Sequence, residues 1–546
     1  MSMKKLRDTG LKAEDLAPQL LLERLARRNA DRIYLRVGDG LMSYGDLDRR
    51  TDRLANGLLA VGIGPGDHVA VMLDNGEEIL LAQFALGKIG AVVCPINTGA
   101  KGELLAYYLT QSNASAIVLG TPSLPRFAAI AARIPNVRRI VHVREPAPSV
   151  DLHGVLPAGM EMIPYESVCH GADRRPGIAV SHEDPAGIFY TSGTTGPSKG
   201  IIASHAQSLT FALGRVEYFG YQPDDVMYTC LPLFHASAMY HAAIAALLAD
   251  AQVAVAKRFS ASGFWRDIRH VGATQFNLLG SMVNILWGLP PSADDRAHRV
   301  RLCGMAPIPP FGPAFEKRFG VPIVTSYGLT DFGQGTILQP GYPPEKFRSV
   351  GKPRPGVEVQ VQDEDGNSLP PGEAGEICLR SDDPTLGGRR YYRMDEANDR
   401  AWRKGWFLTG DRGWFDADGY MYFTDRKKDA IRRRGENISA WEVEQAIAMH
   451  PAVLDVAVVG VTDEMLDEEV LACVVLRPDA HLDEAALVQW CGEQMPRWMV
   501  PRYVELRTNL PRTLTEKIEK RTLRAEAQER LANLWDRERA GIVLER

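Results

Sequence analysis

Apolar residues follow two different periods along the first part of the chain. Mostly apolar runs at 68–73, 91–96, 116–120 and 139–143 are typical of buried strands, whereas 44–62 has its apolar residues at helical spacing. Similar strand-like runs recur at 252–256, 274–279, 301–305 and 322–328. Strands that alternate with amphipathic helices predict helices layered on mostly parallel sheets, so we expect an α/β fold.

The pattern changes beyond about Ser349. The segments 357–380 and 414–426 have period-two alternation around an Asp-Gly turn, which predicts a β-rich segment at the end of the large region. From about Asp429 the chain has its own mixture of helices, at 441–450 and 483–495, and strands, at 455–461, 472–478 and 503–507. This tail is long enough for a small separate α+β domain, joined by the charged linker DRKKDAIRRRG.

Composition restricts the range of functions. The chain has 546 residues, too many for one core, and a net charge of −5, which gives little reason to expect a nucleic-acid surface or a polybasic membrane anchor. The apolar stretch around Ile79–Ile96 is interrupted by Gln83 and Lys88, where a membrane span would avoid them. Seven scattered cysteines without CxxC spacing, and a start without a secretory signal, favour a reducing cytoplasm. We expect small-molecule partners.

The first candidate for chemistry is the loop TSGTTGPSKG, residues 191–200, between two apolar runs. Glycines let backbone amides approach a ligand, and the hydroxyls and Lys199 add donors, so phosphate is the expected guest. Ser198 stands where a P-loop would have glycine, so the P-loop reading fails, and the alternative is a Gly-Thr surface turn.

Two further stretches carry polar groups after apolar runs. In TSYGLTD, Tyr327 could stack on a base, Thr330 could donate to phosphate and Asp331 could hold Mg²⁺; the alternative is a capped strand end. In GWFLTGD, the two acceptor oxygens of Asp411 could receive both ribose hydroxyls. The nearby DADG sequence lacks the remaining ligands of an EF-hand, so we interpret it as a hairpin turn.

The last candidates lie in basic sequence. The cluster at 426–434 is a solvated face or a polyphosphate contact, and Gly435 beside it indicates a close backbone approach or a positive φ. Lys517 in LPRTLTEKIEKR is, by composition, one more exposed lysine.

Together these stretches resemble the adenylate-forming superfamily of acyl-CoA synthetases, peptide-synthetase adenylation domains and luciferases. The motifs TSGTTGPSKG, LPLFH, TSYGLTD, GWFLTGD, DRKKDAIRRRGENI and the final Lys517 occur in the family order over nearly the whole chain. The phrases SYGLTD, RRGENISAWEVE and PPSADDRAHRVR most resemble crotonobetaine/carnitine-type CoA ligases.

The resemblance implies a large N-terminal AMP-binding domain at 1–425, a hinge at 426–428 and a mobile C-terminal domain at 429–546. It assigns the ATP and AMP contacts, within the large domain and its border, to Thr191, Ser192, Gly193, Thr194, Thr195, Gly196, Lys199, Gly304, Met305, Ala306, Ser326, Tyr327, Gly328, Thr330, Asp411 and Arg426. It assigns Mg²⁺ binding to Asp331 and catalysis to Lys517 and His235. It assigns the hinge and the approach of coenzyme A to Lys428 and Gly435. The residues it assigns to the acyl pocket are His235, Phe234, Tyr240 and Phe276.

The implied activity is that of an acid–thiol ligase. A carboxylate is a poor electrophile, so it first attacks the α-phosphorus of ATP, releases pyrophosphate and forms an acyl-adenylate, which the thiol of coenzyme A then converts to a thioester with release of AMP. Positioning and charge neutralisation are most of what such a reaction asks of a protein.

Two departures from the family pattern keep alternatives open. Aspartate stands at 331 where the family usually has glutamate, and Glu516 replaces the glycine before the lysine, so a nucleotide-binding relative without turnover is one alternative. The other is an enzyme that passes the acyl group to a carrier protein; no Ser-bearing carrier domain is recognisable after Lys517, which favours a free-standing ligase. The acid and the oligomeric state, including a homodimer, stay open.

Overall fold

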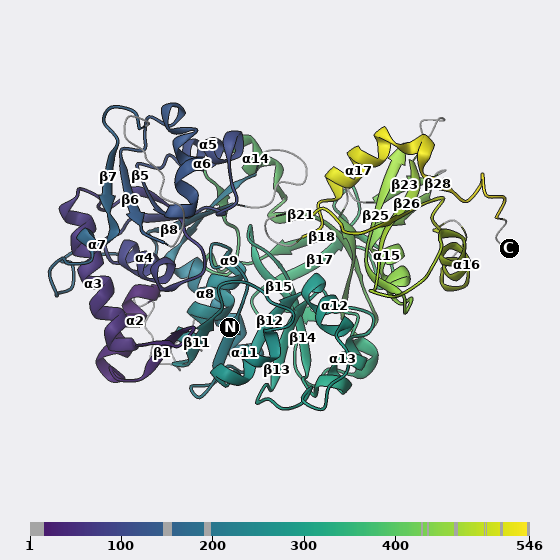
Figure 1. Cartoon of the computed structure of the whole chain (residues 1–546), viewed down its shortest axis with the longest axis horizontal. Coiled ribbons are helices and arrows are strands. Elements are labelled where there is room, and N and C mark those ends of the chain that lie inside the picture. The colour runs from purple at the N-terminus through teal and green to yellow at the C-terminus, as the bar shows by residue number, and fades with distance from the viewer. Residues whose placement is uncertain are drawn as a thin grey trace.

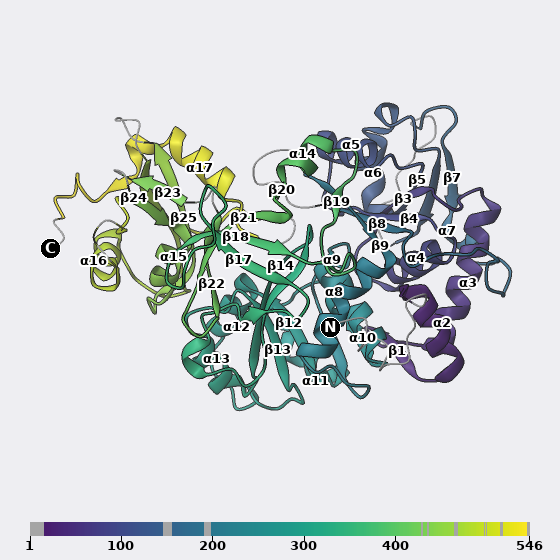
Figure 2. The ribbon, with the colours of Figure 1, turned by 180° about the vertical axis from the view of Figure 1, so that it is seen from behind.

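The computed structural model describes residues 16–145, 156–190, 198–426, 430–433, 436–462, 468–495, 497, 499–513 and 517–542. Figures 1 and 2 show an elongated molecule in which the last part of the chain, yellow-green to yellow, lies at one end beside the green β-rich segment.

The first large sheet belongs to the N-terminal region. Within the described residues it has eight strands in the order β19-β9-β8-β4-β3-β5-β6-β7, and the strands from β8 to β7 are parallel. Two antiparallel additions extend it, because β9 pairs with β8 and with β19. The strands span β3 (His68–Met72), β4 (Val92–Pro95), β5 (Ala116–Gly120), β6 (Arg139–Val143), β7 (Glu161–Pro164), β8 (Pro185–Tyr190), β9 (Gly200–Ser204) and β19 (Arg390–Tyr391).

The second large sheet has nine strands among the described residues, in the order β16-β15-β14-β13-β12-β10-β11-β1-β2, with a parallel centre from β14 to β1. Its strands span β1 (Ile33–Val37), β2 (Gly40–Ser43), β10 (Val226–Thr229), β11 (Gln252–Val255), β12 (Gln275–Leu279), β13 (Leu302–Ala306), β14 (Ile323–Leu329), β15 (Gly333–Leu338) and β16 (Lys352–Pro353). The carboxyl ends of parallel strands meet at one edge, which brings the ends of β10, β12 and β13 together.

Helices cover both sheets and fill the space between them. Helix α8 contacts β8 and β9 of the first sheet and β15 of the second, so it belongs to the shared core. The helices are α2 (Pro18–Arg28), α3 (Tyr44–Ala60), α4 (Glu77–Lys88), α5 (Gly102–Gln111), α6 (Leu124–Ala128), α7 (Tyr165–Val168), α8 (His205–Tyr218), α9 (Ala236–Ala238), the π-helix η4 (Met239–Ile244), α10 (Ala245–Leu248), α11 (Phe264–Val271), α12 (Gly280–Gly288), α13 (Gly312–Phe319) and α14 (Asp395–Arg400). Short 3₁₀ turns lie at η2 (Thr121–Ser123), η3 (Ala131–Arg133) and η5 (Pro344–Lys346).

A β-rich segment with its own small apolar core follows. Strands β17 (Glu358–Gln362), β18 (Gly375–Arg380), β20 (Trp402–Arg403), β21 (Trp406–Phe415) and β22 (Met421–Arg426) form an antiparallel sheet. The DADG sequence is the turn between β21 and β22, where Asp416 Oδ1 accepts the backbone N–H of Tyr420 at 2.9 Å, as predicted for a hairpin.

The C-terminal part has two apolar clusters of its own. It contains the hairpin β23 (Ala430–Arg433) and β24 (Glu436–Ser439), and a four-stranded sheet of β25 (Val453–Thr462), β26 (Glu468–Leu476), β27 (Tyr503–Arg507) and β28 (Trp535–Asp536). Its helices are α15 (Ala440–Ala448), α16 (Glu484–Gln494), α17 (Lys520–Glu529) and the turn η6 (Leu531–Asn533). It contacts the rest of the molecule through α12 against β25 and α15 against β22.

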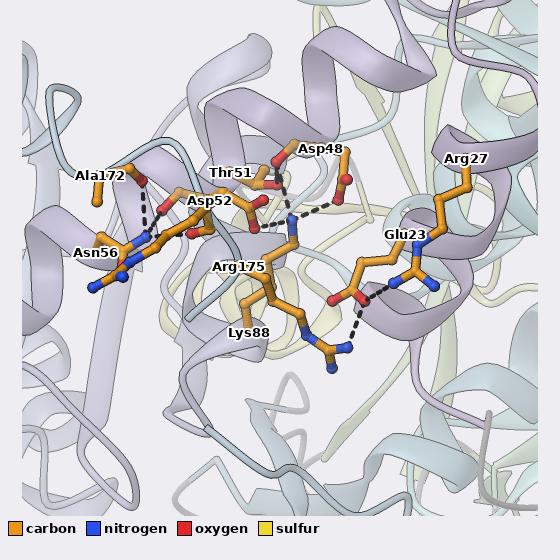
Figure 3. A network of polar contacts seen from close by, with 10 residues as sticks. Glu23, Arg27, Asp48, Thr51, Asp52, Asn56, Lys88, Ala172 and Arg175 are labelled. Atoms are coloured by element: carbon orange, nitrogen blue, oxygen red, sulfur yellow. Dashed lines mark hydrogen bonds and ion pairs between the residues drawn. The ribbon is translucent and has the colours of Figure 1, made fainter. Parts of the chain in front are cut away.

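A buried ion cluster joins α3 to α4 (Figure 3). The Lys88 side chain is 1% exposed, and its ammonium donates to Asp48 Oδ1 and Asp52 Oδ1, both at 2.6 Å, and to the Asp48 carbonyl at 3.0 Å. All three N–H bonds are therefore satisfied, which explains how a lysine interrupts an apolar helix. No helix among the described residues is long and apolar enough to cross a membrane.

The elements predicted from the periodicity are confirmed. The helix expected at 44–62 is α3, and the strands expected in the first region are β3 to β6 and β11 to β14, each within two residues at either end. The predicted β-rich segment and the helices and strands of the tail are present as well.

Candidate active site

Tyr327, near the end of β14, lies against Asp411 of β21. The Tyr327 hydroxyl donates to Asp411 Oδ2 at 2.8 Å, and both side chains are buried. Asp411 also pairs in register with Arg426 of β22, the last residue before the predicted hinge. The structure thus brings together a ring and a carboxylate that are 84 positions apart along the chain, next to the edge of the C-terminal part.

Asp331 and Lys199 meet at Tyr391 of β19. The Tyr391 hydroxyl donates to Asp331 Oδ2 at 2.6 Å, and the Lys199 ammonium lies 4.5 Å from the centre of the Tyr391 ring. Burial and the Asp331 carboxylate raise the pKa of Tyr391, so its hydroxyl stays protonated and donates. This grouping depends on the pairing of β9 with β19, which places Tyr391 opposite Ile201.

Arg389 contacts the chain next to Asp331. Its buried guanidinium donates to the Thr330 carbonyl at 3.4 Å and the Gln207 carbonyl at 2.9 Å, and it lies 4.0 Å from the centre of the Phe211 ring. Burial lowers the pKa of Arg389 to about 9, and the Asp331 carboxylate opposes that shift. Sequence reasoning missed Arg389 and Tyr391, although two arginines and two tyrosines after a glycine pair, in GGRRYY, were a signal of a buried polar contact.

His235 precedes α9 and faces the C-terminal part. Its Nε2 is buried and has no hydrogen-bond partner among the described residues. Burial, and secondly the positive charge of Lys517, lower the pKa of His235 to about 4, so the ring is neutral at pH 7. The Thr513 N–H donates to the Lys517 carbonyl at 2.7 Å. The two predicted catalytic residues therefore interact electrostatically.

The predicted adenine contacts lie on adjacent strands. Gly304, Met305 and Ala306 end β13, and Ser326, Tyr327 and Gly328 lie in β14 beside it. A side chain is excluded at Gly328, where a Cβ would lie 2.5 Å from the Gly333 carbonyl oxygen. At Gly304 a Cβ would lie 2.3 Å from Asn277 Oδ1, so the Asn277 side chain would have to move.

The ring contacts divide the predicted acyl-pocket residues into three groups. The Phe234 ring lies 4.9 Å from that of His235, and Tyr240 packs on Phe189 and Phe211. Phe276, in contrast, packs at right angles on Phe264 of α11, with ring centres 5.1 Å apart, and is 1% exposed. The described contacts therefore place Phe276 in the aromatic core beneath α11, and none joins it to Phe234, His235 or Tyr240.

Several predicted residues lie outside the described part of the chain. They are Thr191 to Gly196 of the glycine-rich loop, together with Lys428 and Gly435. The Arg426 side chain is likewise not described.

The layered α/β fold, the ordered motifs and these clusters define the class of adenylate-forming enzymes. A family model described as "AMP-binding enzyme" matches residues 22–388, and the model "AMP-binding enzyme C-terminal domain" matches residues 442–517. The chain belongs to this AMP-binding enzyme family. The superfamily and fold predicted from the motifs are confirmed.

Curated relatives and solved structures agree with this assignment. The crotonobetaine/carnitine–CoA ligase of Salmonella paratyphi B is 33% identical over 493 residues, covering 88% of this chain and 93% of the relative, and that of Salmonella typhi is 34% identical over 488 residues with the same coverage. The anthranilate CoA ligase AuaEII in complex with anthranoyl-AMP aligns with a TM-score of 0.85 at 26% identity, over 96% of this chain and 99% of that one. ATP-bound MatB from Rhodopseudomonas palustris aligns with a TM-score of 0.79 at 28% identity, over 94% and 99%.

Proposed function

We propose that this protein is an ATP-dependent carboxylate–CoA ligase. The relatives support this reaction class because they include CoA ligases and solved complexes with ATP and with an acyl-adenylate. The observation that best supports the proposal is that the Lys517 charge lowers the pKa of His235, because it links the last residue matched by the C-terminal family model to the LPLFH motif of the AMP-binding segment.

In the first step a carboxylate oxygen attacks the α-phosphorus of ATP, the bond to the bridging oxygen breaks, and pyrophosphate leaves. The loop from Thr191 to Lys199 would hold the phosphates, and Lys517 would neutralise charge that develops around the α-phosphorus. Tyr327 would stack on adenine, and Asp411, oriented by the Tyr327 hydroxyl, would accept the ribose hydroxyls.

Asp331 fits a Mg²⁺ ligand by its chemistry. One of its carboxylate oxygens accepts the Tyr391 hydroxyl, which orients the group, and the side chain is only partly buried. A bound Mg²⁺ would supply neutralisation of phosphate charge. Tyr391 and Arg389 would hold Asp331 and the carbonyl of Thr330 in place.

In the second step the thiol of coenzyme A attacks the carbonyl carbon, the bond to the phosphate oxygen breaks, AMP leaves and the thiol proton is released. Lys517 would have to move away first, so we propose that 429–546 rotates about a hinge at 426–428 relative to 1–425. Gly435 would then approach the thioester site in place of Lys517.

The test is a panel of carboxylic acids with the purified full-length protein, ATP and Mg²⁺, with pyrophosphate as the readout, followed by coenzyme A with AMP and thioester as readouts. Acid-dependent pyrophosphate and coenzyme A-dependent AMP are expected. ATP binding without pyrophosphate for any acid would instead indicate a relative without turnover. Adenylate that moves only to an added carrier protein would indicate the carrier alternative.

A further inference from the structure

Arg215 of α8 is a buried cation that has no anionic partner among the described residues. Its residue surface is 8% exposed, one face of its guanidinium stacks on Phe219 at 4.4 Å from the ring centre, and its Nε–H has no hydrogen-bond partner among the described residues. The acidic group whose charge acts on it is the Tyr221 phenol, and burial raises the pKa of Tyr221 to about 12, so that phenol is neutral. Within the described chain, no carboxylate compensates this charge.

His241 of η4 adds a second unsatisfied donor. Arg215 Nη2 lies 3.1 Å from His241 Nδ1, and because a guanidinium only donates, Nδ1 accepts and the ring hydrogen sits on Nε2. Burial and the charge of Arg215 lower the pKa of His241, which agrees with a neutral ring. His241 Nε2 has no partner among the described residues. The groups left unsatisfied on these two residues are therefore both N–H donors, and only an acceptor can satisfy them.

These donors lie beside the proposed reaction centre. A Cβ on Gly304 would be 3.2 Å from Arg215 Nη1, so the guanidinium lies over the strand that carries the expected adenine contacts. Asn277 of the adjacent strand faces the same point. His241 lies six residues after His235, in the π-helix η4 that directly follows α9.

Two other buried arginines near α8 show that Arg215 is different. Arg389 has the Asp331 carboxylate acting on it, and Arg354 has the charges of Glu217 and Asp383. A buried charge without a partner lowers the free energy of unfolding by several kcal/mol, and an apolar side chain at the same position would avoid that loss. The presence of such a charge at a site therefore points to a ligand that pairs with it.

We propose that Arg215 and His241 bind a second oxygen acceptor, an ionised carboxylate, at the far end of the acid that is activated near His235. The preferred substrate class is thus a dicarboxylate, and this inference rests on the proposed function. A trimethylammonium group, as the names of the curated relatives imply for their own acids, would meet a buried positive charge here and is disfavoured.

The wild-type experiment compares matched acids in the pyrophosphate assay. The series runs through the straight-chain dicarboxylates from succinate to suberate, with the monocarboxylate of equal length and the corresponding ω-trimethylammonium acid for each. A site built around buried donors rejects a ligand that cannot pair with them, so we expect kcat/KM to favour one dicarboxylate over its monocarboxylate by about a hundredfold or more. Equal or better turnover of monocarboxylates or trimethylammonium acids overturns the inference while the proposed function stands.

The variant experiment uses Arg215→Met and Arg215→Lys. Arg215→Met should reduce the dicarboxylate preference to less than about tenfold, and Arg215→Lys should restore part of it because it keeps the charge but not the planar fork. A dicarboxylate preference that is unchanged in Arg215→Met contradicts the assignment.

A stability measurement tests Arg215 without turnover. Arg318 is the matched control, since it stacks on Phe319 at 4.6 Å but is ion-paired with Asp295 at 2.7 Å. Arg318→Met should lower the Tm and leave the acid preference unchanged, whereas Arg215→Met should keep or raise the Tm of the ligand-free protein. A fall in Tm for Arg215→Met as large as that for Arg318→Met would show that Arg215 is a structural residue and overturn the inference. Absence of pyrophosphate with every acid would contradict the proposed function. This outcome can be told apart from a failure of the Arg215 assignment, because the Tm comparison does not depend on turnover.

Discussion

Replacement of Lys517 separates the two proposed half-reactions. Lys517 is exposed and its charge lowers the pKa of His235, and we propose that this is the position it takes in the first step. Lys517→Met keeps most of the side-chain volume and removes the charge. Loss of one preorganised electrostatic contact in the transition state typically costs about 10²- to 10³-fold, ~2.7–4 kcal/mol, and we expect adenylation to slow by that factor.

The second half-reaction provides the contrast. Thioester formation from supplied acyl-adenylate should change little in Lys517→Met, because that step is proposed to use the rotated domain. Single-turnover measurements of pyrophosphate release and of AMP release report the two steps separately. Lys520→Met is the control: Lys520 is three residues away and is ion-paired with Glu444 at 2.7 Å, so both half-reactions should be retained.

The same substitution has a spectroscopic consequence. Lys517 is the second cause of the low pKa of His235, so its removal should raise that pKa above about 4, while burial keeps it below 6.5. NMR titration of the imidazole measures the change. Equal slowing of both half-reactions, or an unmoved His235 titration, would refute the reasoning.

Three other outcomes are expected. Tyr391→Phe removes a hydrogen bond to the Asp331 carboxylate, worth about 1.5–3 kcal/mol for a charged partner, and should raise the Mg²⁺ concentration needed for half-maximal adenylation, with ATP affinity in the absence of metal unchanged. Lys88→Met removes the cation shared by the buried Asp52 and the half-buried Asp48 and should lower the free energy of unfolding in urea by about 3–5 kcal/mol, whereas the exposed Arg49–Asp46 pair should contribute less than about 1 kcal/mol. Burial lowers the pKa of His205 to about 4, below its value of 6.5 when unfolded, so the unfolded state binds the proton first as the pH falls. The contribution of His205 to the free energy of unfolding is therefore complete above pH 6.5 and falls by about 1.4 kcal/mol per pH unit from there to pH 4. His205→Gln should remove this part of the pH dependence of stability.

The local elements and the order of the motifs were determined by the sequence alone. Period-two and helical spacing are properties of consecutive residues, which is why α3, β3 and β17 lie where the pattern predicts. The DADG turn followed for the same reason, since its hydrogen bonds join near neighbours. The family motifs are also contiguous, and their order was enough to identify the superfamily.

The partners of each polar side chain were decided only by the tertiary structure. Tyr391 reaches Asp331 because β19 pairs with β9 across nearly two hundred positions, and no local period encodes such a pairing. Which face of a strand a residue occupies is equally non-local, so Phe276 could be predicted as buried but not as part of the core beneath α11. The sequence pattern does not single out Arg215, and only the packing of α8 against η4 and β13 shows that its charge is buried without a carboxylate partner in the described part of the chain.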